Sequence, residues 1–266
     1  MALFLTNNKT HKLTNLTKKG EIMQKLDASL YPSMFTRQST RTHSGKTLPE
    51  EVLAKIKEYI ENLVPMDTTV GYKFTVEPQN DATYRVNAFY DGTLYGNINV
   101  GFMLQQLDLY LQTQNIGSLW VGMSGKPKGW EAHKPLEYSI CLVFGSPKGK
   151  VRRVSGSGFK RKPITDVISD AGLQDVFEPV RLAPSAANRQ PWFFDAISDK
   201  RIHAYCVQQP FLLERIFKKL NQIDMGIVLL HAALALQHVG FDFELSMLDP
   251  APTKQGYTYI ATFNLE

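Results

Sequence analysis

The chain has 266 residues, of which 43% are hydrophobic, so it can bury a sizeable core in one large domain or two small ones. Residues 1–22 contribute +3 to its formal net charge of +5, and the other 244 residues carry 26 basic and 24 acidic side chains, a balance too mild to indicate nucleic-acid binding. No apolar stretch reaches the roughly 18 residues of a membrane span, because His231 interrupts the longest one, 225–236.

The two cysteines limit redox and metal chemistry. Cys141 and Cys206 each lie in an apolar, strand-like run, and neither belongs to a Cys-x-x-Cys or Cys/His cluster. This pattern is typical of reduced core thiols in a cytoplasmic protein, so we expect no disulfide and no metal site.

Residues 1–22 differ in character from the rest of the chain. Their apolar start is too short for a signal peptide. The run Lys18-Lys19-Gly20-Glu21 can be encoded only by purine-rich codons, and Met23 comes just after it. We interpret residues 1–22 as a leader, a translated ribosome-binding site with Met23 as the native start.

Residues 23–147 are expected to form a first half. Its extended strip, Arg37-Gln-Ser-Thr-Arg41, approaches a helix that Pro49 and the two glutamates after it open. Residues 98–112 carry apolar side chains at helical spacing and stop at Asn115-Ile-Gly117, which predicts a buried helix with a C-cap. A strand over 137–145 comes next.

Residues 148–163 are expected to be a basic linker without a core of its own. The segment is rich in Gly, Ser and Pro and carries seven cations and no acid between Lys148 and Lys162. Two interpretations stay open, a solvated connector or, for one or two of these cations, an anion clamp.

Residues 164–266 are expected to form a second half of the same design. A helix containing Phe177 and Val180 should stop at Ala183-Pro184, since the residue before a proline avoids helical geometry. A turn leads into a strand near Trp192, and a buried helix and a strand over 256–264 come later.

The two halves share residues at constant spacing. At an offset of 125, apolar, glycine and glutamine positions recur, including Gly101 with Gly226, and Asn99 has Asp224 as its near-equivalent. The strands 137–145 and 256–264 match at an offset of 119. Chance similarity of apolar helices and strands is the alternative. The common order of elements favours two similar halves packed as a pseudo-dimer in one chain, with a ligand at their interface.

Two motifs carry the candidate chemistry. In an extended strip Arg37, Ser39 and Arg41 project to one side, where guanidinium groups suit a phosphate and a hydroxyl suits a polyol. Alone, such a strip is a weak signal, because an Arg-x-Ser-x-Arg run is more often a solvated surface. In the turn after Pro184, Ser185 and Asn188 can bond to the turn or to a ligand, and two small alanines let a flat ring approach. The alternative for this turn is an ordinary capped connection.

Together these motifs resemble those of the nitroreductase family of FMN-dependent oxidoreductases, and in particular its single-chain branch with two nitroreductase-like halves. The matching segments are Arg37-x-Ser39-x-Arg41 and Ala183-Pro-Ser-x-x-Asn-x-Gln-Pro-Trp192. The resemblance implies an α+β fold with a mixed central sheet flanked by helices.

The resemblance also implies roles for particular residues. Arg37, Ser39 and Arg41, with Gln38 beside them, would hold the FMN phosphate and ribityl chain, and Pro184, Ser185 and Asn188 would contact the isoalloxazine from the other half. The backbone at Gly122 and Met123 would reach the reactive edge of the flavin, and Arg161 and Lys162 would close on the phosphate. The second half has no Arg-x-Ser-x-Arg and the first has no Pro-Ser-x-x-Asn, so we expect one FMN site per chain.

The expected function depends on that cofactor. Hydride would pass from NADH or NADPH through the flavin N5 to a nitroaromatic, quinone-like or other conjugated acceptor, with a cation such as Arg41 stabilising reduced flavin and no obligate catalytic side chain. We expect a monomer or weak homodimer with a small-molecule acceptor as partner and neither membrane nor nucleic acid. The alternatives are a specialised flavin dehydrogenase, a flavin-binding or sensing protein without turnover and, last, a nucleic-acid binder using the linker.

Overall fold

The computed structural model describes residues 24–153 and 158–266, so the predicted leader lies outside the described residues. Its α-helices are α1 (Glu50–Glu61), α2 (Leu94–Thr113), α3 (Gln174–Arg181) and α4 (Phe211–His238). The 3-10 helices are η1 (Ala28–Phe35), η2 (Trp130–His133), η3 (Ile164–Asp166), η4 (Ala171–Leu173) and η5 (Ala186–Asn188). The strands are β1 (Tyr72–Pro78), β2 (Thr83–Tyr90), β3 (Gly117–Val121), β4 (Glu137–Gly145), β5 (Trp192–Ser198), β6 (Arg201–Val207), β7 (Phe243–Ser246) and β8 (Tyr257–Leu265).

The strands form two four-stranded sheets, in the orders β1-β2-β4-β3 and β5-β6-β8-β7. Every pairing within these sheets is antiparallel. The α+β class is confirmed, but the single mixed central sheet that we expected is wrong. The helical crossover from β2 to β3 does leave those two strands pointing the same way, yet β4 lies between them and pairs antiparallel with both.

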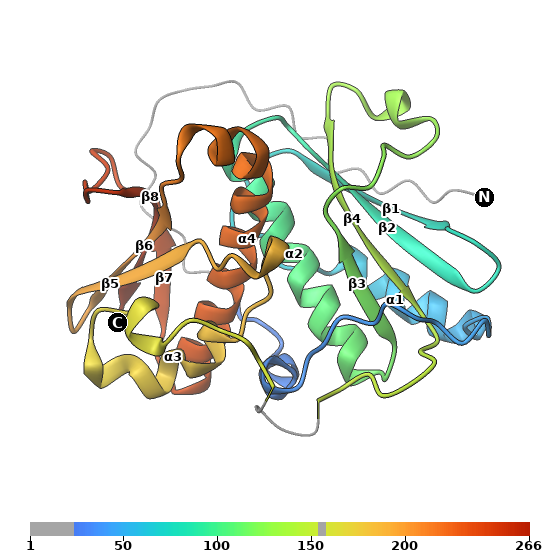
Figure 1. Ribbon diagram of the computed structural model, residues 1–266, viewed down its shortest axis with the longest axis horizontal. Helices are drawn as coiled ribbons and strands as arrows, with labels where there is room; N and C mark the ends of the chain where they lie inside the picture. Colours follow the sequence, from blue (N-terminus) through green and yellow to red (C-terminus); the bar gives the residue numbers. More distant parts are fainter. Residues whose placement is uncertain (1–23, 154–157) are drawn as a thin grey trace.

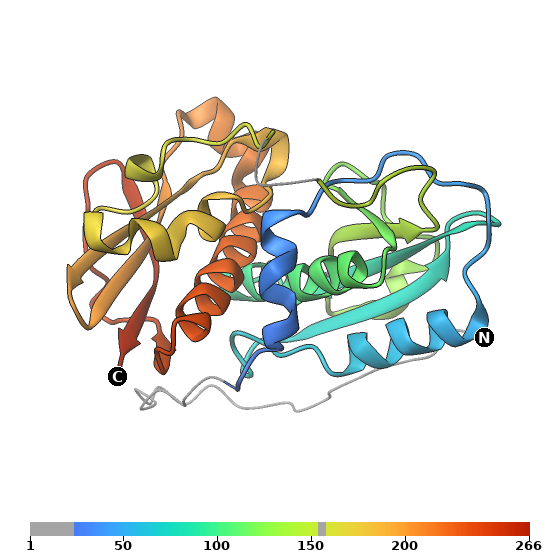
Figure 2. The same cartoon turned by 90° about the horizontal axis from the view of Figure 1, so that it is seen from below.

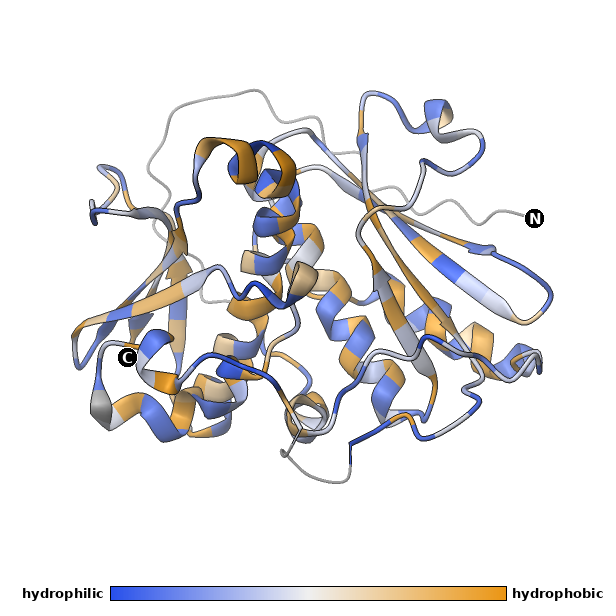
Figure 3. Cartoon of the chain, in the orientation of Figure 1, coloured by the Kyte–Doolittle hydropathy of each residue, from blue (hydrophilic) through white to orange (hydrophobic). Residues whose placement is uncertain are grey.

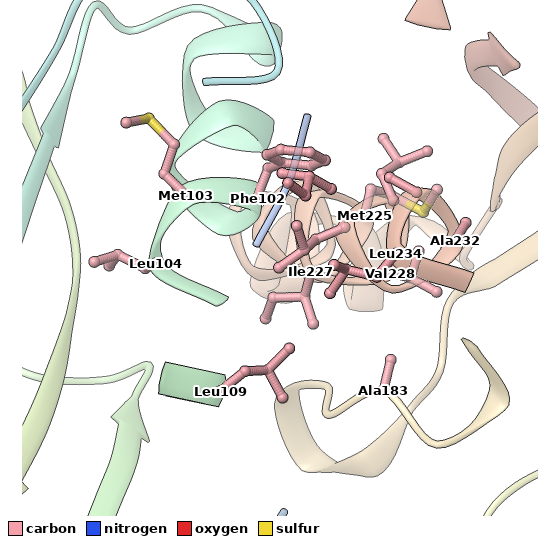
Figure 4. Close-up of a cluster of buried hydrophobic side chains, with 14 of the residues drawn as sticks. Phe102, Met103, Leu104, Leu109, Ala183, Met225, Ile227, Val228, Ala232 and Leu234 are labelled. Atoms are coloured by element: carbon pink, nitrogen blue, oxygen red, sulfur yellow. The ribbon is translucent and has the colours of Figure 1, made fainter. Parts of the chain in front are cut away.

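The two central helices, α2 and α4, lie between the two sheets rather than outside them (Figure 1). Nearly all of α2 from Gly96 to Gln112 is buried, because the helix packs against α4, η1 and strands β2, β3 and β4. The core between them contains Phe102, Leu109, Ile227 and Leu234 (Figure 4). The connecting loops are mostly hydrophilic (Figure 3), so the apolar sequence is concentrated in the sheets and central helices.

Helix α4 is the longest of the described elements. It corrects the expectation that no apolar stretch is long enough for a membrane span. Among the described residues it is a helix long and apolar enough to cross a membrane by length and composition. However, 83% of its apolar window is buried inside the molecule, where it packs against α2 and α3. Its packing is that of a core helix.

The short helix η1 lies across α2 and α4 (Figure 2). The backbone at Leu26, just before η1, is bound on both sides by one side chain: Leu26 N donates to Gln237 Oε1 at 2.9 Å, and Gln237 Nε2 donates to Leu26 O at 2.9 Å. These bonds attach the start of η1 to the end of α4, and Arg37 comes two residues after the end of η1.

Several local predictions are confirmed. Helix α1 begins after Pro49, and α3 ends at Arg181, before Ala183 and Pro184. Strand β4 has the predicted bounds. Asn115 and Gly240, just past α2 and α4, both have positive φ, as expected of left-handed helix termini.

Candidate functional site

A cavity of about 380 Å³ lies between the two halves of the chain. The first half contributes Arg37, Ser39, Arg41, Leu119, Trp120, Gly122, Met123 and Ile140, and the second half contributes Pro184, Ser185, Ala186, Ala187, Phe217, Leu220, Ile223, Asp224 and Ile227. The extended strip and the turn after α3, more than 140 residues apart in the sequence, therefore meet at one site.

The extended strip is held in place by the backbone of its neighbours. Thr40 N donates to Ser118 O at 2.8 Å, and Arg37 forms an antiparallel bridge with Arg152 of the linker. Because the strip is extended, alternate side chains face the same way, and Arg37, Ser39 and Arg41 all line the cavity.

Arg37 is buried, with 5% of its surface exposed, and its orientation is fixed by Asp108 of α2. Its Nε lies 2.5 Å from Asp108 Oδ2, and its Nη2 donates to Ser39 Oγ at 3.3 Å. Ser118 Oγ and Trp120 Nε1 also donate to Asp108, at 2.5 and 3.2 Å. One carboxylate thus organises a guanidinium, a hydroxyl and an indole at one end of the cavity.

Arg41 is the contrasting cation. Its side chain is exposed, and within the described part of the chain it has neither a hydrogen bond nor an ion pair. Its charge is therefore available to a bound anion, whereas that of Arg37 is shared with Asp108.

The opposite wall is the turn just after α3. Asp224 of α4 accepts from Ala186 N at 3.0 and 3.1 Å, and Ser185 Oγ accepts from Gln190 N at 2.9 Å. Ala187, Asn188 and Gln190 have φ values of 49°, 55° and 51°, a left-handed backbone that non-glycine residues adopt rarely. Such strain persists only where the surroundings determine the conformation, as the two side-chain bonds do here.

Asp224 has an unusual environment for a carboxyl group. Burial raises its pKa to about 8, although the Ala186 amide and nearby Arg189 act in the opposite direction. The carboxyl group is therefore mostly protonated at neutral pH, and it lies on the cavity wall.

Four of the predicted site residues do not line the cavity. Gln38 Nε2 donates to Lys150 O at 2.6 Å, and Lys162 Nζ donates to Gln190 O at 3.0 Å. Asn188 accepts from Arg161 Nη1 at 2.6 Å. These contacts fasten the linker to the strip and to the strained turn.

Arg161 is bound to the protein rather than solvated. Its Nε and Nη2 donate to Ala183 O and Leu182 O, both at 3.1 Å, where α3 ends. Burial lowers its pKa to about 10, and Arg37, Arg153 and Arg181 add to the effect. The positive charge of the linker is thus concentrated next to the Arg37 end of the cavity.

Gly122 and Met123 come after β3, at the rim. A Cβ on Gly122 would lie 3.0 Å from Leu220 Cδ2, so a larger residue would crowd the cavity wall. Met123 is 94% exposed. The segment Gly117–Val121 before them is strand β3, and this places the backbone at 122–123 at a sheet end.

The walls between the two polar ends are apolar. Leu119, Trp120 and Ile140 come from the first sheet, and Phe217, Leu220 and Ile227 from α4. The Arg189 guanidinium lies 4.2 Å from the ring centre of Phe217 and supports that wall. Cations at one end, apolar walls and a small-residue turn fit a flat aromatic group bearing a phosphate tail, and the volume is within the usual range for ligand pockets.

Sequence reasoning missed the carboxylates that organise this site. Asp108 is the acidic side chain in an otherwise apolar and amide-bearing helix, and a buried charge needs a partner. That signal could have marked Asp108 as paired, but the sequence could not identify Arg37, 71 residues away, as its partner.

His231 and the two cysteines lie outside the cavity lining. His231 is buried between Gln105 Nε2 at 3.1 Å and Pro179 O at 3.0 Å, and burial lowers its pKa to about 4, which confirms a core histidine. Both cysteines are free thiols, of which Cys141 is buried and Cys206 is half-buried. Within the described residues no group of three His, Cys, Asp or Glu side chains could hold a metal ion.

Comparison with known proteins identifies the family and the fold of the chain. A family model described as "Putative TM nitroreductase" matches residues 29–236. The crystal structure of a "putative nitroreductase" from Thermotoga maritima is 21% identical, with a TM-score of 0.60 and 98% of each chain covered. No curated protein matches the chain.

Two further solved structures resemble part of the chain. A structure described as a "Putative NADH dehydrogenase/NAD(P)H nitroreductase" from Bacteroides thetaiotaomicron is 17% identical, with a TM-score of 0.37, and the match covers 48% of this chain and 91% of that one. A nitroreductase family protein from Clostridium difficile is 14% identical, with a TM-score of 0.41, covering 53% and 95%.

The fold and the family model define an oxidoreductase with a nitroreductase-like α+β fold. The chain belongs to the nitroreductase family that the matching model describes, and that family is generally flavin-dependent.

Proposed function

We propose that this chain is an FMN-dependent NAD(P)H oxidoreductase that reduces a nitroaromatic, quinone-like or other conjugated acceptor. The observation that carries the proposal is the single cavity in which the Arg37–Arg41 strip of one half faces the Pro184–Ala187 turn of the other. When bound there, FMN would supply the centre that accepts hydride from NADH or NADPH and donates it to the acceptor.

The residues of the chain have distinct tasks in this proposal. Arg41 and Ser39 bind the phosphate and the hydroxyls of the tail, and Arg37, oriented by Asp108, adds a fixed positive charge. Ala186 and Ala187 let the ring lie against the turn. Arg161, Lys162, Asn188 and Gln38 act indirectly by holding the turn and the strip, and no side chain is assigned as an acid or base.

We also propose that the two halves form a pseudo-dimer with one FMN site. The helix crossing supports it: a Cβ on Gly101 would meet Ile223 O at 2.2 Å, and a Cβ on Gly226 would meet Ile98 O at 1.9 Å. This reciprocity is what a two-fold relation produces. We propose a monomer or weak homodimer located in the cytoplasm, with no nucleic-acid or membrane partner.

The polar residues on the two central helices support the same relation. Asn99 Oδ1 accepts from Met66 N at 2.7 Å, as Asp224 accepts from Ala186 N. The strip of cations has no counterpart in the second half, so only one of the two related places can hold a phosphate.

Arg41→Ala tests the site. We expect the variant to fold normally and to bind FMN about tenfold or more weakly, because an available charge on the phosphate is lost. Fluorescence titration of flavin-free protein with FMN measures the affinity, and Arg201→Ala, an exposed cation on β6, is the control. Equal affinity in wild type and Arg41→Ala would refute the assignment.

Turnover is tested separately. Purified protein loaded with FMN should lose its visible flavin absorbance on addition of NADH or NADPH without oxygen, and regain it with a quinone or nitroaromatic compound. Persistent colour with both nicotinamides would favour a flavin-binding protein without turnover.

A further inference from the structure

A second cavity, of about 870 Å³, lies on the other face of α4. Its α4 lining includes Lys218, Asn221, Gln222 and Met225. The candidate flavin cavity is instead lined by Phe217, Leu220, Ile223, Asp224 and Ile227. Each set has the three- and four-residue spacing of one helix face, so α4 is the wall between two cavities.

Asn221 is a polar group for which the described protein supplies no partner. The residue is 3% exposed, and neither its Oδ1 nor its Nδ2 has a hydrogen bond. Leaving a buried amide unpaired is unfavourable, because its hydrogen bonds to water are lost without replacement. The neighbouring amides are paired, since Asn97 Nδ2 donates to Gln222 Oε1 at 3.1 Å and to Lys219 O at 3.0 Å. Asn221 is thus placed to bond with a molecule inside the cavity.

The rim of this cavity is positively charged. Arg215 and Lys218 are exposed and, in the described parts of the chain, have no hydrogen bond or ion pair. Lys219 Nζ donates to Tyr138 O at 2.5 Å and lies 4.9 Å from the ring centre of Tyr90. Glu214 is the one acidic side chain among the described lining residues. The balance favours an anionic group at the rim.

The interior is partly apolar. Leu94 comes from the start of α2, Met225 from α4 and Ile260 from β8. A ligand with an apolar body would remove these side chains from water, which favours its binding.

We propose that this second cavity binds an anionic amphiphile, a small molecule with one acidic group and an apolar body. The acidic group lies at Arg215 and Lys218, the apolar body contacts Leu94, Met225 and Ile260, and a polar atom bonds with Asn221. This site is separate from the oxidoreductase function and does not depend on bound flavin.

Isothermal titration of the full purified chain with decanoate, below its micellar concentration, tests the proposal. We expect saturable binding of one decanoate per chain. Asn221→Leu removes the unpaired amide without opening a hole, and it should weaken binding by about fivefold or more. Arg215→Gln combined with Lys218→Gln should also weaken it about fivefold, through exposed positions that do not affect folding.

Two controls locate the bound molecule. Arg41→Gln, in the candidate flavin cavity, and Lys57→Gln, on the remote helix α1, should leave the decanoate affinity unchanged. Neutral 1-decanol should bind more weakly than decanoate. The proposal is overturned by absence of saturable binding, by equal affinity in the wild type and the Arg215→Gln/Lys218→Gln variant, or by loss of binding in Arg41→Gln alone.

Discussion

Asp224 and Asn99 do the same structural work at corresponding places on α4 and α2, yet only Asp224 can ionise. Each accepts a hydrogen bond from the backbone of the turn after the preceding helix, at Ala186 N and at Met66 N. A neutral side chain is therefore sufficient for this bond. Burial, which raises the pKa of Asp224 to about 8, keeps it neutral too near physiological pH.

Because Asp224 can ionise, we predict that the free energy of unfolding depends on pH. The folded carboxyl group has a pKa of about 8 and the unfolded one has its ordinary pKa of 3.8, so between these values the unfolded state loses its proton first. The free energy of unfolding then falls as pH rises, by up to about 1.4 kcal/mol per pH unit, and the effect ends above the folded pKa.

Asp224→Asn should remove this dependence while keeping the bond to Ala186. Urea unfolding of flavin-free protein at pH 5, 6 and 7 measures it, and the variant should gain stability over wild type with each step upward. Asp166→Asn, an exposed position, is the control. If the free energy of unfolding changed with pH in the same way in wild type and Asp224→Asn, the raised pKa of Asp224 would be contradicted.

At the scale of elements, local signals in the sequence predicted more than long-range ones. Pro49 and Pro184 marked where helices begin and end, because a proline fixes its own φ and keeps the residue before it out of helical geometry. The sheet was predicted wrongly because β4 lies between β2 and β3 through pairing of strands that are far apart in the sequence. No local sequence pattern indicates such a pairing. The buried pair Arg37–Asp108 was missed for the same reason.

The turn after α3 combines a correct prediction with an unpredicted conformation. Ser185 and Asn188 do bond within the turn or to the linker, but Ala187 adopts a φ of 49°, which its sequence did not indicate. A left-handed backbone costs a non-glycine residue about 1–2 kcal/mol.

Two matched glycine substitutions test that strain. Ala187→Gly should leave the free energy of unfolding unchanged or raise it by up to about 1 kcal/mol, because glycine adopts this φ freely. Ala186→Gly, next to it with a helical backbone, should lower it by about 0.5–1 kcal/mol through added freedom of the unfolded chain. Chemical denaturation compares them, and equal losses in both variants would mean that the turn is unstrained.

At the scale of the whole molecule, the two halves are joined chiefly where α2 crosses α4. The backbones approach so closely that glycine is required on both helices, since a Cβ on either Gly101 or Gly226 would lie within 2.2 Å of a carbonyl oxygen of the other helix. The cavity between the strip and the turn depends on this helix spacing, because its two ends come from different halves.

Gly226→Ala should therefore destabilise the protein by about 3 kcal/mol, despite the better helix propensity of alanine, because the helices must move apart. Gly101→Ala should do the same, and the double variant should lose less than the sum, since one separation accommodates both methyl groups. Gly125→Ala, where a Cβ meets nothing within 4 Å, should change stability by less than about 0.5 kcal/mol. Thermal and urea unfolding compare these four variants with the wild type, and strict additivity of the two central substitutions would show that the glycines do not share one contact.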